Sequence, residues 1–159
     1  MQKSKLKSLI HFHFIVFIFG FTAILGSLIS IDSLSLVWYR MSIAFLVLLI
    51  LSIFLRKNIF VSKSLLLKML FAGVLIALHW ITFFKAIKVS NVSITLSVLS
   101  LGAFFTSFLE PFFYKRKIIK YEVVLGVIVV IGMSLIFRSQ LYYLEGIIYA
   151  ILSVFLLFV

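Results

Sequence analysis

The feature that most constrains this chain is a series of long apolar runs separated by short basic connections. A helix that crosses a lipid bilayer needs roughly 20 apolar residues, within a range of about 17–25. The first four runs meet this length, and the fifth meets it when Tyr121 and Glu122 join its inner end. The pattern predicts an all-α polytopic membrane helix bundle with five transmembrane helices plus an incomplete sixth. The runs cover residues 9–31, 34–55, 65–87, 92–113, 123–137 and 146–159.

Composition identifies the solvent that surrounds these runs. Of the 159 residues, 65% are hydrophobic and 12% are charged. Soluble domains carry about 45–50% apolar and about 25% charged residues. Several of the runs also lack the polar face that a helix in a soluble core would show. We therefore expect a multi-pass protein of the cell membrane, with the lipid bilayer as its immediate partner.

The basic residues indicate how the chain is inserted. If the apolar segments alternate in direction, eleven of the fifteen Lys and Arg fall on one side, namely Lys3, Lys5, Lys7, Arg56, Lys57, Lys63, Lys68, Lys115, Arg116, Lys117 and Lys120. The other side receives Lys85, Lys88 and Arg138. Since loops rich in Lys and Arg stay in the cytoplasm, we expect the amino terminus to be cytoplasmic. The net charge of +11 is then a topology signal, and no nucleic acid is expected as a partner.

Arg40 stands near the start of the second run, directly after Trp38 and Tyr39. One interpretation places its side chain at the lipid headgroups beside an aromatic belt, which long cationic side chains reach by snorkelling. The other places it in a water-filled cavity inside the bundle, where it attracts a carboxylate or phosphate. A central arginine costs ~2.5–3.5 kcal/mol or more, which favours a polar interior over lipid. In this second case Leu48, two turns further along, would face lipid.

The third run contains His79, roughly two turns inside the membrane and among aromatic residues. Trp80 and Phe84 share one helix face, and His79 and Phe83 share the adjacent one, because residues four apart are neighbours. These side chains would form an aromatic wall that could contact a solute, and His79, its one titratable group, could carry a proton. The alternative is helix packing with a hydrogen-bonded histidine.

Small residues recur at helical spacing. The fourth run carries a stripe of serines, namely Ser93, Ser97, Ser100 and Ser107. Such serines either let helices pack closely, with hydroxyls bonding across the contact, or contact a solute, for which Ser97 and Ser100 are the candidates. Glycines that would let backbones approach closely are Gly20, Gly26, Gly126 and Gly132.

The dipeptide Glu110-Pro111 stands near the end of the fourth run. Proline removes a backbone hydrogen bond, so we expect the helix to end or kink there. Glu110 either pairs with the basic residues at 115–117 or acts as a proton-coupling carboxylate. At the start of the same run, Ser90 or Asn91 is expected to cap the helix.

Motifs of soluble enzymes do not occur in this sequence. The chain has no cysteine, which excludes a disulfide framework and a thiolate metal site. It also has no P-loop, dinucleotide fingerprint, nucleophile elbow or cluster of metal-ligand residues. We therefore expect no enzymatic activity, no cofactor and no bound metal.

Four stretches taken in order resemble the EamA branch of the drug/metabolite transporter superfamily. They are "WYRMSIAF", "LIALHWITFFKAIKVSNVSITLSVLS", "FFTSFLEPFFYKRKI" and "LGVIVVIGMSLIF". The resemblance covers roughly residues 8 to 159. The chain departs from it where many relatives have a proline in place of Ala103, and where "KRK" replaces a Gly-Glu pair.

The resemblance implies ten helices built as two five-helix repeats of opposite orientation. Residues 1–8 would be a basic cytoplasmic amino terminus, 9–137 the first EamA-like repeat, and 138–159 an external loop with the start of a truncated sixth helix. The family implies export of small metabolites or drugs by alternating access, with the solute between the repeats. Arg40, His79 and Trp80 would line the first half of that site. A single half would then need a second transporter half, or another copy of itself, to transport.

Two other classes of protein remain open. A small multidrug exporter working as a dimer would need a membrane-embedded glutamate in its first helix, and the first run contains none. A non-transporting membrane scaffold protein would use all the residues named above for packing.

Overall fold

The computed structural model describes residues 2–57, 60–138 and 140–158. Met1 of the expected cytoplasmic amino terminus (residues 1–8) and Val159 of the expected sixth helix (within residues 138–159) lie outside the described residues. The helices are α1 (Gln2–Leu28), α2 (Ser33–Phe54), α3 (Lys63–Val89), α4 (Val92–Leu99), α5 (Leu101–Tyr114), α6 (Lys120–Arg138), the short 3₁₀ helix η1 (Leu141–Tyr143) and α7 (Leu144–Phe158). The predicted all-α membrane helix bundle is confirmed.

Within the described residues, four helical segments have both the length and the hydropathy of a membrane span: α1, α2, α3, and α4 together with α5. Helix α6, with 19 residues, lies in the same length range. Only 11% of the most apolar window in each of the first three spans is buried within the bundle. Helices that expose apolar side chains all round are suited to lipid and not to water.

Polar side chains at the connections determine where three helices begin. The carboxylate of Asp32 accepts a hydrogen bond from the backbone N–H of Ser35 at 3.0 Å, and Ser62 caps α3 in the same way through Leu65. The hydroxyl and then the backbone N–H of Ser35 lower the pKa of Asp32 below its usual value. Asn91 caps α4 by accepting from the N–H of Ile94 at 2.9 Å, which confirms it as one of the two expected caps.

The fourth span is broken at a place that the sequence did not indicate. Helix α4 ends at Leu99 and α5 begins at Leu101, and the Ser100 hydroxyl donates to the carbonyl of Ser97 at 2.5 Å. Pro111 lies inside α5, which continues to Tyr114, so the expectation that the helix ends at Glu110-Pro111 is wrong. Serine that bonds back to its own helix competes with the helical hydrogen bonds. Ser107 and Ser134 do the same inside unbroken helices, so this bond accompanies the break at Ser100 without being sufficient for it.

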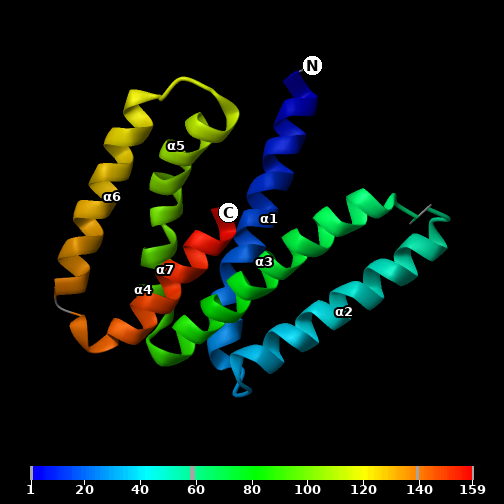
Figure 1. Ribbon diagram of the computed structural model, residues 1–159, viewed down its shortest axis with the longest axis horizontal. Helices are drawn as coiled ribbons and strands as arrows, with labels where there is room; N and C mark the ends of the chain where they lie inside the picture. Colours follow the sequence, from blue (N-terminus) through cyan, green and yellow to red (C-terminus); the bar gives the residue numbers. More distant parts are fainter. Residues whose placement is uncertain (1, 58–59, 139, 159) are drawn as a thin grey trace.

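Helix α3 is the element around which the others gather. Figure 1 shows α7 lying along α3, and α5 and α6 forming a pair at one side of the bundle. The first turns of α2 pack on the same carboxyl-terminal half of α3 that α7 contacts. One core cluster surrounds α7 and comprises Ala86, Ile94, Val98, Met133, Ile147, Ala150 and Val154. A second joins α1, α2 and α3 through Ala23, Leu36, Val37, Phe83, Phe84 and Ile87. At the end of α3, the Lys88 ammonium donates to the carbonyl of Ile29 at 2.7 Å and ties α3 to the end of α1.

Several connections lie at two edges of the bundle as the basic residues predict, whereas the end of α2 and the start of α3 lie away from both edges (Figure 1). The amino-terminal end of α1 and the α5–α6 connection lie at one edge, and the α1–α2 and α3–α4 connections lie at the other (Figure 1). Lys115, Arg116 and Lys117 belong to the first edge, whereas Lys88 belongs to the second. The charge asymmetry therefore corresponds to a spatial separation.

Two of the four expected glycines are close-contact positions. A Cβ at Gly26 would meet the ring of Phe84, and one at Gly126 would meet Phe104 on α5. A Cβ at Gly20 or at Gly132 would meet nothing within 4 Å among the described residues. Close helix approach thus explains Gly26 and Gly126 only.

We predict that Gly26→Ala destabilises the bundle by about 1–2 kcal/mol, because overpacking typically costs ~1–3 kcal/mol and higher helix propensity returns ~0.5–1. Phe84 is 2% exposed and has little room to move away. The matched control is Gly20→Ala on the same helix, which should be neutral or slightly stabilising. Thermal unfolding in detergent micelles measures both, and an equal shift for the two variants would contradict the assignment.

Candidate functional site

Arg40 projects from α2 toward the aromatic face of α3. Its guanidinium carbon lies 4.2 Å from the centre of the Trp80 ring and 5.6 Å from the centre of the Phe84 ring. The two rings are themselves stacked, with centres 5.7 Å apart and planes at 23°. A guanidinium over a Trp face is attracted by about 0.5–1 kcal/mol when exposed and about 2 when desolvated. This contact holds a cation partly inside the bundle.

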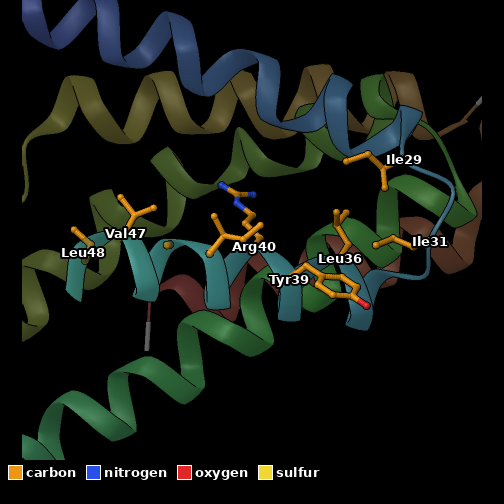
Figure 2. A pocket seen from close by; sticks show the side chains of 9 residues that line it. Ile29, Ile31, Leu36, Tyr39, Arg40, Val47 and Leu48 are labelled. Carbon is orange, nitrogen blue, oxygen red and sulfur yellow. The ribbon is translucent and has the colours of Figure 1, made fainter. Parts of the chain in front are cut away.

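Two cavities meet at this arginine. The larger, the Arg40 cavity, has a volume of about 710 Å³ and is lined by Ile29, Ile31, Leu36, Tyr39, Arg40, Ile43, Ala44, Val47 and Leu48. Figure 2 shows the Arg40 side chain extending from α2 away from Tyr39, with Val47 and Leu48 further along the same helix. The smaller, the Thr22 cavity, has about 230 Å³ and lies between α1, α2 and Phe84. Arg40 lines both.

These positions favour the cavity interpretation of Arg40 over anchoring at the headgroups. Trp38, which lines none of the three cavities, is 70% exposed, whereas Arg40 is half-buried and contacts Trp80 of α3. Leu48 lines the same cavity as Arg40 and is 60% exposed, so the expectation that it faces lipid stays a prediction. Positions 40, 44 and 48 repeat at the four-residue spacing that places side chains on one helix face.

His79 is buried in the contact between α3 and α7. Its Nδ1 lies 2.8 Å from the backbone carbonyl oxygen of Ser153 and 2.9 Å from the Ser153 hydroxyl. Because a carbonyl only accepts, Nδ1 carries a proton and donates to it. The Ser153 hydroxyl donates in turn to the His79 carbonyl at 3.2 Å. The hydrogen bonds expected for a packing histidine are present, and a role of His79 in solute or proton contact stays a prediction.

His79 also reaches a third cavity of about 180 Å³, the His79 cavity. Trp80 and Phe83 from α3 and Thr22 from α1 line it as well, and Thr22 belongs to the Thr22 cavity too. The aromatic wall predicted for α3 is present: the His79 ring stacks on Phe83 with centres 6.1 Å apart and meets Trp80 edge-on at 5.2 Å. The three cavities therefore form a row that shares lining residues from Arg40 to His79.

The serine stripe does not join this row. Ser93 and Ser100 are exposed, Ser97 is half-buried, and Ser107 is buried and donates to the carbonyl of Phe104 in its own helix. The three cavities are lined from α4 by Leu96 and Leu99 and not by Ser97 or Ser100. A role of these two serines in solute binding stays a prediction.

Glu110 pairs at the edge of the bundle and not in the row of cavities. Its carboxylate lies 2.8 Å from the Arg116 guanidinium, which also reaches Glu122 at 3.2 Å. All three side chains are partly exposed. The expected pairing of Glu110 with the basic residues at 115–117 is confirmed for Arg116.

Three contributors to the site were missed or left out of the candidate set. Phe84 lies beneath Arg40 and Trp80, and its four-residue spacing from Trp80 was the available signal. Thr22 links two cavities and is a polar residue within an apolar run. Ser153 binds His79 from a helix 74 residues further along, for which the sequence offers no signal.

These features define a multi-pass membrane protein with a row of small cavities and one inward-facing arginine. The chain matches the EamA-like transporter family over residues 7–138 and belongs to that family, as the resemblance in its sequence predicted. The family and the apolar helices together make it a membrane transporter of the drug/metabolite kind. The comparisons with curated proteins and with solved structures give no match.

We predict that His79 and Ser153 are energetically coupled. A double-mutant cycle of His79→Phe and Ser153→Ala should give a coupling of about 0.6 kcal/mol, with about 1.7 as the upper bound for hydrogen bonds between membrane helices. The control cycle pairs His79→Phe with Ser134→Ala, whose hydroxyl donates to Val130 in its own helix and should show no coupling. Unfolding in detergent micelles supplies the four free energies, and zero coupling in both cycles would contradict the contact.

Proposed function

We propose that this protein is a secondary transporter that exports small metabolites or drugs across the cell membrane by alternating access. The solute would enter the Arg40 cavity and contact Arg40, Trp80 and Phe83 along the row toward His79. The amino terminus would be cytoplasmic, as the distribution of basic residues indicates. The observation that supports this most is the half-buried guanidinium of Arg40, which lies on an aromatic face and opens on a cavity of about 710 Å³.

A volume of this size suits a small organic solute, because ligand pockets span about 300–1,000 Å³. The Thr22 cavity shares Arg40 with it, and the His79 cavity shares Thr22 with the Thr22 cavity, so the three together would offer a route from α2 toward α3. Trp80 separates Arg40 on one side from His79 on the other. A solute that displaced or rotated this ring would connect the two polar groups.

We further propose that residues 9–137 act as one repeat of an inverted pair. Alternating access of this kind works by motion of one repeat against the other around a site near the midplane. Long spans with 11% of their apolar window buried leave much surface for a second repeat. The second repeat would come from a further transporter half. Another copy of this chain would have to insert in the opposite orientation, which the asymmetry of its basic residues opposes.

The test is transport by the chain coexpressed with the opposite-orientation repeat of an EamA-family transporter. Co-purification first establishes that the two repeats assemble. Vesicles are loaded with a defined metabolite mixture, and mass spectrometry measures which solutes leave. We expect saturable, gradient-driven loss of at least one solute, reduced at least tenfold by Arg40→Gln and by Trp80→Ala.

The matched control is Arg138→Gln, which removes an exposed arginine at the end of α6 and should leave transport unchanged. Assembled repeats that move no solute would contradict the proposal. Equal losses of transport for Arg40→Gln and Arg138→Gln would show a general charge effect and would remove Arg40 from the site.

A further inference from the structure

We propose that the Arg40 cavity takes an amphiphilic organic anion, with one oxyanion head on an apolar body. This inference rests on the proposed function, because it names the class of solute for the same cavity. It follows from three features: the unpaired charge of Arg40, the apolar lining, and the orientation of the guanidinium on Trp80.

Within residues 2–57, 60–138 and 140–158, no ion pair neutralises the charge of Arg40. The chain has four acidic side chains. Asp32 caps α2, Glu110 and Glu122 both bind Arg116, and Glu145 lies in the first turn of α7. A cation partly removed from water and left without a counter-ion is a strong attractor of anions.

The rest of the lining is suited to an apolar body. Besides Arg40, only Tyr39 carries a polar side-chain atom, and the other seven residues are aliphatic. An inorganic anion would lose its hydration against such walls without replacement contacts. An apolar body gains by burial in proportion to the area that leaves water. The cavity therefore favours an anion that carries its own hydrophobic group.

The geometry also explains the use of arginine at this position. The guanidinium carbon lies 4.2 Å from the centre of the Trp80 ring, and the N–H groups of a guanidinium point outward in its own plane. Those donors match the two oxygens of a carboxylate or phosphate in a bidentate pair, which a lysine ammonium does not reproduce. Trp80 thus positions the binding group, and the anion contacts Arg40 itself.

The experiment measures binding separately from transport. The chain has two tryptophans, and Trp38→Phe leaves Trp80 as the single reporter beside Arg40. This variant is placed in phosphatidylcholine vesicles and titrated with cyclohexaneacetate. The probes 2-cyclohexylethanol and 2-cyclohexylethylamine have the same body with a neutral or a cationic head. We expect saturable change of Trp80 fluorescence with the acid only, at least tenfold weaker in Arg40→Gln and partly restored in Arg40→Lys.

Circular dichroism confirms that each variant keeps its helices, and a melting curve checks that Arg40→Gln remains folded. Equal responses to the three probes, or an acid response that survives Arg40→Gln, would overturn the proposal. Vesicles of phosphatidylglycerol test whether a lipid headgroup is the anion, and loss of the acid response there would overturn the assignment to a solute. Transport of a neutral or cationic solute would refute this inference and leave the proposed function standing. If the assembled repeats bind cyclohexaneacetate but transport no solute, only the proposed function is refuted.

Discussion

The aromatic stack on α3 is the interaction on which the rest of the bundle depends. Phe84 fits against Gly26 of α1 and fills the core that α1, α2 and α3 share. The Trp80 ring stacks on Phe84 and makes a cation–π contact with the guanidinium of Arg40, which belongs to α2. Trp80 and Phe84, one turn apart on α3, therefore hold α1, α2 and α3 together. The same two rings position the guanidinium of Arg40 in the candidate site.

A cation in hydrocarbon needs compensation, and the structure shows how far the protein supplies it. The ring of Trp80 offsets part of the cost through cation–π attraction, but the acidic side chains lie elsewhere. This incomplete compensation is the basis of our proposal that Arg40 binds an anion from outside the protein. Arg40 thus serves both stability and the proposed binding of a solute. An arginine fully paired with a carboxylate would stabilise the bundle but would not attract a solute.

The sequence predicted those features that depend on local periodicity and on charge. Run length predicted the spans, the spacing of His79, Trp80 and Phe83 predicted the aromatic wall, and proximity along the chain predicted the pairing of Glu110 with Arg116. It did not predict the docking of α7 on α3, since the partners His79 and Ser153 are 74 residues apart. The sequence also did not show that Leu48, which is 60% exposed, lines a cavity together with Arg40, because an apolar residue at a cavity mouth has the same pattern as one facing lipid.

The most direct test of the account is the accessibility of position 40 to water. The chain has no native cysteine, so Arg40→Cys introduces a single thiol. Phe45→Cys is the control, since Phe45 is 64% exposed on the outside of α2 and lines none of the three cavities. A membrane-impermeant maleimide applied to the protein in vesicles should label position 40 and leave position 45 unlabelled. Equal labelling of the two positions, or none at either, would contradict a water-accessible cavity at Arg40.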